Sequence, residues 1–379
     1  MRWSEGGAEH DALWRSERGA PPPSKIVVVD DRLSAEEGYG LAAQGVGLLW
    51  RGDYRNARQV LAALGHRYER LAARKARSAG AAAAPSMADA FNAERRSRAQ
   101  RARTLGMLLV PLEPDYTIPL RHAPDLRDAC LETYGPATEP SLVALRELLG
   151  VVGAHEWRRK GVEVPALAGR IHPHYGIFAP VRGEYVDLVA KSPLPGALES
   201  TPLAFDVGTG TGVLAAVLAR RGIARVVATD TEPRALACAR ENLERLGLAA
   251  RVELLRADLF PEGRAGLVVC NPPWVPARPS SPLEHGIYDA DSRMLRGFLQ
   301  GLASHLVEGG EGWLVLSDLA EHLGLRSRAE LEAMFDRSGL RVAGRIDARP
   351  GHKRAADEED PLHAARRAEV TSLWRLAPR

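Results

Sequence analysis

From about residue 200 onward, β-branched apolar runs alternate with stretches of helical length, and this alternation constrains the fold more than any other feature. The expected strands cover 204–207, 226–230, 252–255, 267–270, 312–316, 340–347 and 370–376. The expected helices between them include 212–221, 232–246, 291–306 and 328–338. Alternation at these lengths predicts an α/β fold, in which a mainly parallel sheet is covered by helices on both faces.

The connection over 348–368 is charged, contains proline and shows no convincing crossover helix. A strand that returns without a crossover helix should run antiparallel to its neighbour. We therefore expect a seven-stranded sheet whose last strand is antiparallel.

The first part of the chain has a different pattern. Residues 1–24 end in three prolines and are expected to be a flexible leader. Residues 25–165 are expected to form a mostly helical substrate-recognition domain, and 166–379 a second domain. Within 25–165 we expect a strand at 25–31, helices at 34–78, 87–103, 123–134, 141–152 and 154–160, and a strand or helix at 105–112.

The composition excludes several classes of protein. Hydrophobic residues make up 45% and charged residues 26% of 379 residues, with a net charge of +3, as in ordinary globular proteins. The three cysteines are far apart and form no CxxC pair, so neither a disulfide framework nor a zinc site is expected. The polar N-terminus is no signal peptide, and no apolar run is long enough to span a membrane. We expect a cytoplasmic protein.

A glycine-rich run follows the first strand of the alternating region: Asp206-Val207-Gly208-Thr209-Gly210-Thr211-Gly212. Glycines let the backbone turn tightly and approach a ligand closely, although dinucleotide-binding folds use a related pattern. The next strand ends in Asp230-Thr231, where a carboxylate can accept hydrogen bonds from two ribose hydroxyls. Asp258-Leu259 follows the third strand and is placed to meet an adenine edge.

Each acid also fits a local role. Asp230 could cap the helix that begins near Glu232, and Asp258 could be a turn residue before Pro261. Their alignment on successive strand ends favours a nucleotide-like cofactor.

The fourth strand is followed by Asn271-Pro272-Pro273-Trp274. The Asn271 side-chain oxygen and the Pro272 carbonyl can both accept hydrogen bonds from a flat NH2 group, and Trp274 offers a flat face to a planar acceptor. Accepting both N–H groups stabilises positive charge that builds on the nitrogen. A plain proline turn is the structural alternative.

These motifs carry a resemblance. Residues 200–320 resemble class I S-adenosylmethionine (SAM)-dependent methyltransferases with a Rossmann-like sheet, of the NPPY/NPPF N-methyltransferase type. They look most like HemK-like protein glutamine-N5 methyltransferases and also like small-domain RNA methyltransferases. The resemblance rests on residues 206–212, 228–248 and 271–274. It implies that Asp206, Gly208, Gly210 and Asp230 contact SAM and that Asn271 binds the target amine.

Two features of the resemblance are imperfect. Pro180 to Glu184 partly echoes a segment that closes over SAM in HemK-like enzymes, which makes Arg182 a candidate cofactor residue. Tryptophan replaces the usual tyrosine or phenylalanine at position 274, which keeps a stacking face but widens it.

The acceptor is left open between a protein glutamine and an RNA or DNA base amine. From 51 to 103 there are 13 Lys and Arg against 4 Asp and Glu, which fits either a solvated helix face or a surface for phosphates or an acidic protein. A SAM-binding regulator without turnover is a third alternative. His172 and His174 have no third ligand at suitable spacing, so no metal site is expected.

Overall fold

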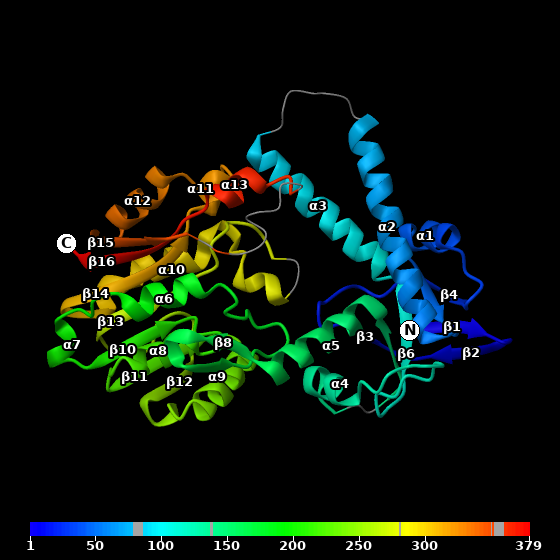
Figure 1. Ribbon diagram of the computed structural model, residues 1–379, viewed down its shortest axis with the longest axis horizontal. Coiled ribbons are helices and arrows are strands. Elements are labelled where there is room, and N and C mark those ends of the chain that lie inside the picture. Colours follow the sequence, from blue (N-terminus) through cyan, green and yellow to red (C-terminus); the bar gives the residue numbers. More distant parts are fainter. Residues whose placement is uncertain (79–85, 137–138, 280–281, 350, 352–359) are drawn as a thin grey trace. The chain divides into compact units, whose positions relative to one another are not determined.

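The computed structural model describes residues 1–78, 86–136, 139–279, 282–349, 351 and 360–379. The chain divides into two compact units (Figure 1). The N-terminal unit contains Met1–Pro85 and Asn92–Glu156, and the C-terminal unit contains Ser86–Phe91 and Trp157–Arg379. The division therefore falls after Glu156 rather than near 165, because the apolar residues Val164 and Leu167 pack in the core of the C-terminal unit.

The N-terminal unit is built on a five-stranded sheet in the order β3-β7-β6-β5-β4. Only the β6–β7 pair is antiparallel among the described pairs of this sheet. Its strands are β3 (Leu13–Arg15), β4 (Lys25–Val29), β5 (Val46–Trp50), β6 (Leu108–Leu112) and β7 (Ser141–Ala144). The helices of this part of the chain are α1 (Ala35–Ala43), α2 (Tyr54–Ser78), α3 (Met87–Leu105), α4 (Arg127–Tyr134) and α5 (Leu145–Lys160).

The prediction that residues 1–24 form a flexible leader is wrong, because residues 2–15 contain three strands. Strands β1 (Arg2–Glu5) and β2 (Ala8–Asp11) form an antiparallel hairpin, and β3 joins the five-stranded sheet. Gly6 and Gly7 make the two-residue turn with φ of 60° and 84°, a conformation that glycine adopts without a Cβ penalty. Trp3 is buried against Leu49, Leu109 and Leu142, so the hairpin covers one face of the sheet.

The helix expected over 34–78 is interrupted. Gly45, with φ of 80°, ends α1, and the apolar run Val46–Trp50 becomes the buried strand β5 before α2 begins. Likewise, residues expected to be helical from 141 start with strand β7, and the apolar piece at 105–112 is strand β6. More residues of this unit are helical than extended, as expected. The helices pack around a five-stranded sheet of which the sequence predicted only the strand at 25–31 and, as one of two alternatives, the strand at 105–112.

The C-terminal unit contains the expected seven-stranded sheet, in the order β12-β11-β10-β13-β14-β16-β15. The strands are β10 (Leu203–Val207), β11 (Arg225–Asp230), β12 (Val252–Arg256), β13 (Ala265–Cys270), β14 (Leu306–Ser317), β15 (Leu340–Ala348) and β16 (Thr371–Pro378). Strand β16 is antiparallel to both β14 and β15, which confirms the expected topology.

The other elements of this unit are short or lie on the sheet faces. A small hairpin, β8 (Val162–Val164) and β9 (Gly169–Ile171), precedes the sheet. The helices are α6 (Gly183–Lys191), α7 (Ala197–Ser200), α8 (Val213–Arg220), α9 (Pro233–Arg245), α10 (Arg293–Leu302), α11 (Leu319–His322), α12 (Arg328–Arg337) and α13 (His363–Ala368). Short 3-10 turns cover Pro165–Leu167, Ala249–Arg251, Pro282–Gly286, Ala290–Ser292 and Ala303–His305. Helix α13 lies in the 348–368 connection, of which 350 and 352–359 are outside the described residues.

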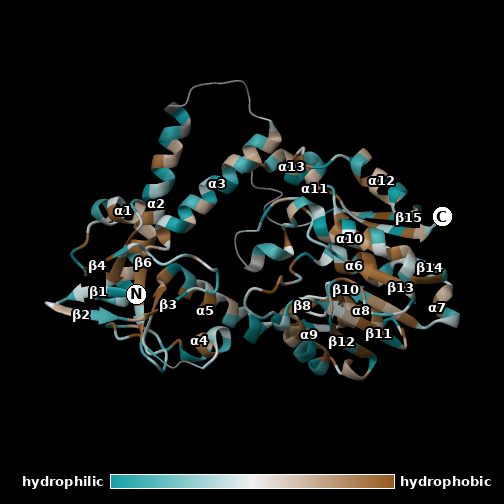
Figure 2. Cartoon of the chain, turned by 180° about the vertical axis from the view of Figure 1, so that it is seen from behind, coloured by the Kyte–Doolittle hydropathy of each residue, from teal (hydrophilic) through white to brown (hydrophobic). Residues whose placement is uncertain are grey.

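Alternate residues of each strand face opposite sides of the sheet, as strand geometry requires. In β13, Leu267 and Val269 belong to one core cluster, which α6 and α8 cover, and Val268 belongs to the other, which α10 and α12 cover. The hydrophobic strands are brown in the centre of this unit in Figure 2. Among the described residues, no helix is both long and apolar enough to cross a membrane.

Candidate functional site

Three of the predicted loops meet because of strand register. In the sheet, Val207 of β10 pairs with Thr229 of β11 on one side and with Cys270 of β13 on the other. The glycine run, Asp230 and Asn271 therefore follow adjacent parallel strands, which lie about 4.8 Å apart. This carboxyl edge is where open α/β sheets bind their ligands.

The three glycines of the run all have positive φ, but they face different surroundings. A Cβ on Gly212 (φ 80°) would lie 3.0 Å from the Cβ and 3.1 Å from the Cα of Ala239 on α9, and one on Gly208 would meet the flexible end of Met294. At Gly210 (φ 55°), a Cβ would have no atom within 4 Å. Gly212 thus permits close packing of two helices, whereas Gly210 borders open space in which a ligand can approach the backbone.

Asp206 braces this loop from inside the protein. Its side chain is buried, and Oδ2 accepts hydrogen bonds from Thr209 Oγ1 at 2.6 Å and from the backbone N of Ala215 at 3.0 Å. Burial raises the pKa of the Asp206 carboxyl to about 6. The carboxylate therefore joins the glycine loop to the first turn of α8.

Asp230 connects the second strand to the same loop. Its Oδ2 accepts a hydrogen bond from the Gly210 backbone N at 2.9 Å, and its Oδ1 accepts one from the Glu232 backbone N at 3.0 Å. The local role at the start of α9 is thus present. Each carboxylate oxygen has a second lone pair, and the half-buried side chain can still accept from hydroxyl groups of a ligand. Burial raises the pKa of Asp230.

The pair Asp258-Leu259 lies beyond β12. Leu259 has φ of 76°, an uncommon conformation for a residue with a branched side chain, and its carbonyl accepts a hydrogen bond from Thr229 Oγ1. The Asp258 side chain is exposed and pairs with Arg293 at 2.6 Å. The backbone of this turn is tied to β11, while the carboxylate already has a cationic partner.

Asn271 and Trp274 are joined within their own loop. Trp274 Nε1 donates a hydrogen bond to Asn271 Oδ1 at 2.8 Å. The loop is fixed further along by hydrogen bonds from the Val275 backbone N to the Ile287 carbonyl at 3.2 Å and from the Asp289 backbone N to the Val275 carbonyl at 3.0 Å. The side chain of Trp274 is partly buried and packs against three core clusters.

Arg182 lies beside this loop. Its guanidinium carbon is 4.7 Å from the centre of the Trp274 ring. All three guanidinium nitrogens have protein partners: Nε donates to Glu184 at 2.7 Å, Nη1 to Glu369 at 3.0 Å and Nη2 to Thr371 at 3.4 Å. The structure thus brings Arg182 next to Trp274 and pairs it with protein groups on that side.

Glu369 contacts Arg182 beside the site but was not among the site residues predicted from the sequence. This residue is 2% exposed and lies just before β16, where its Oε1 accepts a hydrogen bond from Ser317 Oγ at 2.6 Å. Its partners Arg182 and Ser317 are far away in the sequence. The one available signal was an acidic residue directly before an apolar strand at the carboxyl edge of β14.

The two histidines have structural partners. His172 Nδ1 lies 2.6 Å from the Arg158 carbonyl oxygen, and His174 Nε2 lies 3.2 Å from Glu241. Among the described residues, no three His, Cys, Asp or Glu side chains are grouped in a way that could hold a metal ion. The three cysteines, Cys130, Cys238 and Cys270, are buried free thiols.

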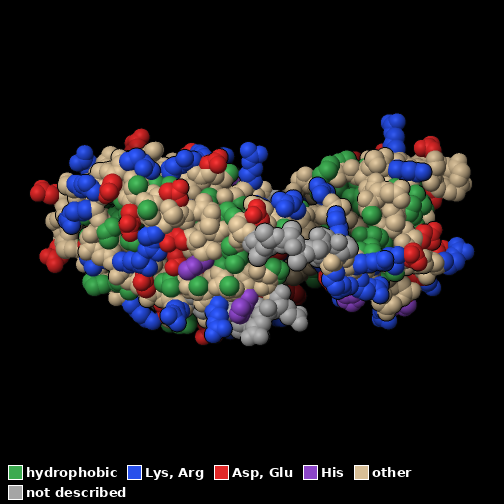
Figure 3. All heavy atoms as spheres, turned by 90° about the horizontal axis from the view of Figure 1, so that it is seen from above, with side chains coloured by type: hydrophobic (Ala, Val, Ile, Leu, Met, Phe, Trp, Pro, Cys, Tyr) green, Lys and Arg blue, Asp and Glu red, His purple; other side chains and the backbone are tan. Residues whose placement is uncertain are grey.

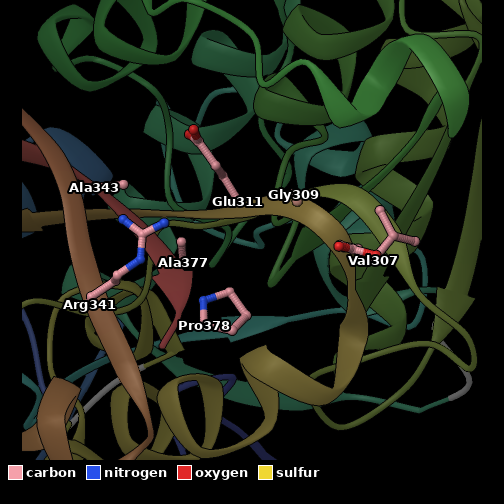
Figure 4. A pocket seen from close by; sticks show the side chains of 9 residues that line it. Val307, Gly309, Glu311, Arg341, Ala343, Ala377 and Pro378 are labelled. Carbon is pink, nitrogen blue, oxygen red and sulfur yellow. The ribbon is translucent and has the colours of Figure 1, made fainter.

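A surface pocket exists at the opposite edge of the sheet (Figure 4). It is lined by residues at the beginning of β14, including Val307 and Glu311, and by Arg341 and Pro378. Glu311 is already paired with Arg375 at 2.6 Å. The pocket is therefore remote from the carboxyl-edge loops and plays no part in the candidate site.

Comparisons with known proteins cover the region that carries these loops. Residues 196–340 match the family model described as Methyltransferase small domain. A ribosomal protein L11 methyltransferase from Pelotomaculum thermopropionicum is 51% identical over 69 residues, 18% of this chain and 22% of that protein. A release factor glutamine methyltransferase from Cereibacter sphaeroides is 38% identical over 168 residues, and the match covers 38% of this chain and 59% of that protein.

The chain thus spans less than two thirds of the length of these curated relatives. Among solved structures, a SAM-dependent methyltransferase from Geobacter sulfurreducens in complex with S-adenosyl-L-homocysteine matches with a TM-score of 0.35 and 22% identity. That match covers 56% of this chain and 95% of the other.

Proposed function

We propose that this chain is a SAM-dependent N-methyltransferase, because residues 196–340 match the family model described as Methyltransferase small domain. The observation that carries the proposal is the pairing of Val207 with Cys270, which sets the glycine loop directly beside the Asn271–Trp274 loop. An adenosine-containing methyl donor and a planar NH2 group would then meet at one sheet edge.

The residues at this edge fit the donor. Gly210 leaves open space at the loop, and Asp230 keeps lone pairs for two ribose hydroxyls. The Leu259 turn would border the adenine, and Asp206 holds the loop in place. When bound, SAM supplies an electrophilic methyl group on a sulfonium. The protein has to position the acceptor nitrogen in line with that methyl group.

Asn271 and Pro272 would hold the acceptor. An amide nitrogen is a poor nucleophile because its lone pair is delocalised. If Asn271 Oδ1 and the Pro272 carbonyl accept hydrogen bonds from its two N–H groups, the positive charge that builds on nitrogen is stabilised. The leaving proton is then released from a cationic nitrogen, so no strong general base is needed.

The first substrate candidate is a protein glutamine side chain. The relatives named release factor glutamine methyltransferase support it, among them the 38% identical protein from Cereibacter sphaeroides. The N-terminal unit, which lies outside the matched family model, is the proposed substrate-recognition part.

A second candidate is a base amine in RNA or DNA, which the charge of α2 and α3 favours. Arg55, Arg58, Arg70, Arg74 and Arg96 are exposed on these helices. Figure 3 shows several Lys and Arg side chains over this part of the chain. Such a surface would neutralise phosphates and make binding salt-dependent.

One experiment separates the two candidates. Radiolabelled SAM and the purified chain are added to an extract of source cells that lack the gene, and the product is treated with protease, RNase or DNase. Label lost only with protease supports the glutamine substrate, whereas label lost with a nuclease supports the base amine.

The matched variant is Asn271→Ala. We expect it to bind SAM with unchanged affinity by calorimetry and to lose methyl transfer by at least about a hundredfold, the scale for removing a charge-stabilising group. Normal transfer by this variant would contradict the assignment of the acceptor loop. Normal SAM binding without transfer by the wild-type chain into any extract would instead favour a SAM-binding regulator.

A further inference from the structure

We infer that Trp274 is a positioning residue that orients the amide of Asn271, rather than a stacking surface for the acceptor. The inference deepens the proposed function and rests on it. Of these two side chains, only Asn271 then contacts the acceptor, and Trp274 supplies an N–H donor that phenylalanine lacks.

The hydrogen bond between Trp274 and Asn271 fixes the orientation of the Asn271 amide. An indole N–H only donates, so it can pair with the oxygen of the Asn271 amide and not with the nitrogen. The 2.8 Å contact from Trp274 Nε1 to Asn271 Oδ1 therefore selects one of the two orientations of the amide. The carbonyl oxygen has two lone pairs, and the second is left for an N–H group of the substrate.

The opposite orientation would harm the proposed reaction. An amide turned by 180° would present its own NH2 group where the acceptor NH2 group has to bind. Two donors would then face each other, and the positive charge that builds on the acceptor nitrogen would be destabilised. A residue that holds the carbonyl in place is thus directly useful to the reaction.

The contacts of the indole ring hold Trp274 in place. The ring packs against core clusters on both faces of the sheet and against a third cluster that includes Val275. The guanidinium of Arg182 lies 4.7 Å from the ring centre. Arg182 thus covers one face of this partly buried ring and leaves less of it for a planar acceptor, while the apolar contacts hold the direction of its N–H.

Arg182, which lies beside the Trp274 ring, is itself held by three hydrogen bonds. Its three nitrogens bond to Glu184, Glu369 and Thr371, and the buried Glu369 also accepts from Ser317 at the end of β14. Charge-assisted bonds of this kind are stronger than neutral ones. A continuous set of contacts therefore runs from the sheet through Glu369, Arg182 and Trp274 to Asn271.

The test begins with the seven indole N–H resonances of the ¹⁵N-labelled full-length protein. Trp274→Phe keeps an aromatic ring, removes the donor and identifies the Trp274 resonance by its loss. Trp157→Phe is the matched control, because Trp157 is 49% exposed and lies outside the site. In Asn271→Ala, we expect the Trp274 resonance to shift and its N–H to exchange faster with water.

Methyl transfer into the gene-deficient extract supplies the second readout. We expect Trp274→Phe to lower kcat about 3- to 10-fold, the range for one net hydrogen bond, with an unchanged KM for SAM. Trp157→Phe should match the wild type. Normal SAM affinity of each variant shows that the site is folded.

The possible outcomes separate the two claims. If Asn271→Ala leaves the Trp274 resonance unchanged, or if Trp274→Phe transfers methyl groups at the wild-type rate while Asn271→Ala does not, the positioning role is overturned and the proposed function stands. If Asn271→Ala transfers normally, the proposed function itself fails, whatever the resonance shows.

Discussion

At the scale of single residues, the two acids of the candidate cofactor loop differ in their surroundings. Asp206 is enclosed by Thr209 and Ala215, whereas Asp230 is half-buried and shares its oxygens between Gly210 and Glu232. Both follow the same sequence pattern of an acid at a strand end. The first therefore shapes the loop, and the second retains lone pairs for a ligand.

The raised pKa of Asp206 makes the stability of the protein depend on pH. The folded chain holds the proton up to a pKa of about 6. An unfolded aspartate releases it at about pH 3.9, so stability present at low pH is lost as the pH rises through the unfolded and then the folded pKa. Asp206→Asn has no such ionisation. The unfolding free energy of the wild type relative to Asp206→Asn should fall by about 1 kcal/mol from about pH 5 to about pH 7.5.

Urea unfolding of both proteins at the two pH values measures this difference. A relative stability that is constant or rises with pH would show that the carboxylate is ionised without cost in the folded protein.

Some residues of the candidate site could be predicted from the sequence, and others could not. Asp230, Gly210 and Asn271 stand at strand ends, and the sheet register that brings them together follows from the order of the elements. The hydrogen bond from Trp274 and the burial of Glu369 depend on contacts between distant segments, and local patterns do not encode such contacts.

At the scale of elements, the glycine run serves two packing needs. Gly212 starts α8 with φ of 80°, and its lack of a side chain lets α8 approach Ala239 of α9. Gly210 also has a positive φ but borders open space. Substitution by alanine should thus affect helix packing at one position and ligand access at the other.

We expect Gly212→Ala to lower the free energy of unfolding by about 2–4 kcal/mol, because about 1–2 kcal/mol of left-handed strain adds to overpacking against the α9 backbone. Gly210→Ala should cost only the strain, about 1–2 kcal/mol, and should weaken SAM binding more than Gly212→Ala does. Urea unfolding and calorimetric titration with SAM measure the two effects. Equal losses of stability would argue against the close approach of α8 and α9.

Secondary structure could be predicted well where strands and helices have uniform lengths. All seven expected strands of the C-terminal sheet are present, six of them within two residues of their expected bounds, while β14 begins at Leu306, six residues before the expected start. In the N-terminal unit, β5 and β7 are short apolar segments that continue directly into or out of helical patterns. Periodicity cannot separate such segments from buried helix, and long-range pairing with β6 decides the outcome.

At the scale of the whole molecule, neither unit is one continuous piece of chain. The C-terminal unit includes Ser86–Phe91, which precedes all its other residues in the sequence and contains the start of α3. Phe91 is 4% exposed and packs in a cluster with Val275, Leu323 and Leu362, and its ring lies 6.2 Å from that of Tyr288. This early segment therefore packs against the segment that directly follows Asn271–Trp274, the proposed acceptor loop.

Phe91→Ala in the full-length chain should cost about 3–5 kcal/mol, the usual range for a buried phenylalanine. Because Val275 directly follows Trp274, we also expect lower methyl transfer. Thermal unfolding and the transfer assay measure the two losses. The control is Asn92→Ala, at the adjacent and exposed position of the same helix, which should leave both quantities nearly unchanged. Wild-type transfer by Phe91→Ala would show that the proposed acceptor loop, Asn271–Trp274, keeps its shape without this ring.

The position of Phe91 also bears on synthesis at the ribosome. The N-terminal half of the chain is made first, at about 5–20 residues per second, and Phe91 emerges long before Val275, Leu323 and Leu362. During that interval its ring cannot pack against these three residues. The cluster that Phe91 shares with Val275, Leu323 and Leu362 can therefore form only when nearly the whole protein has been translated.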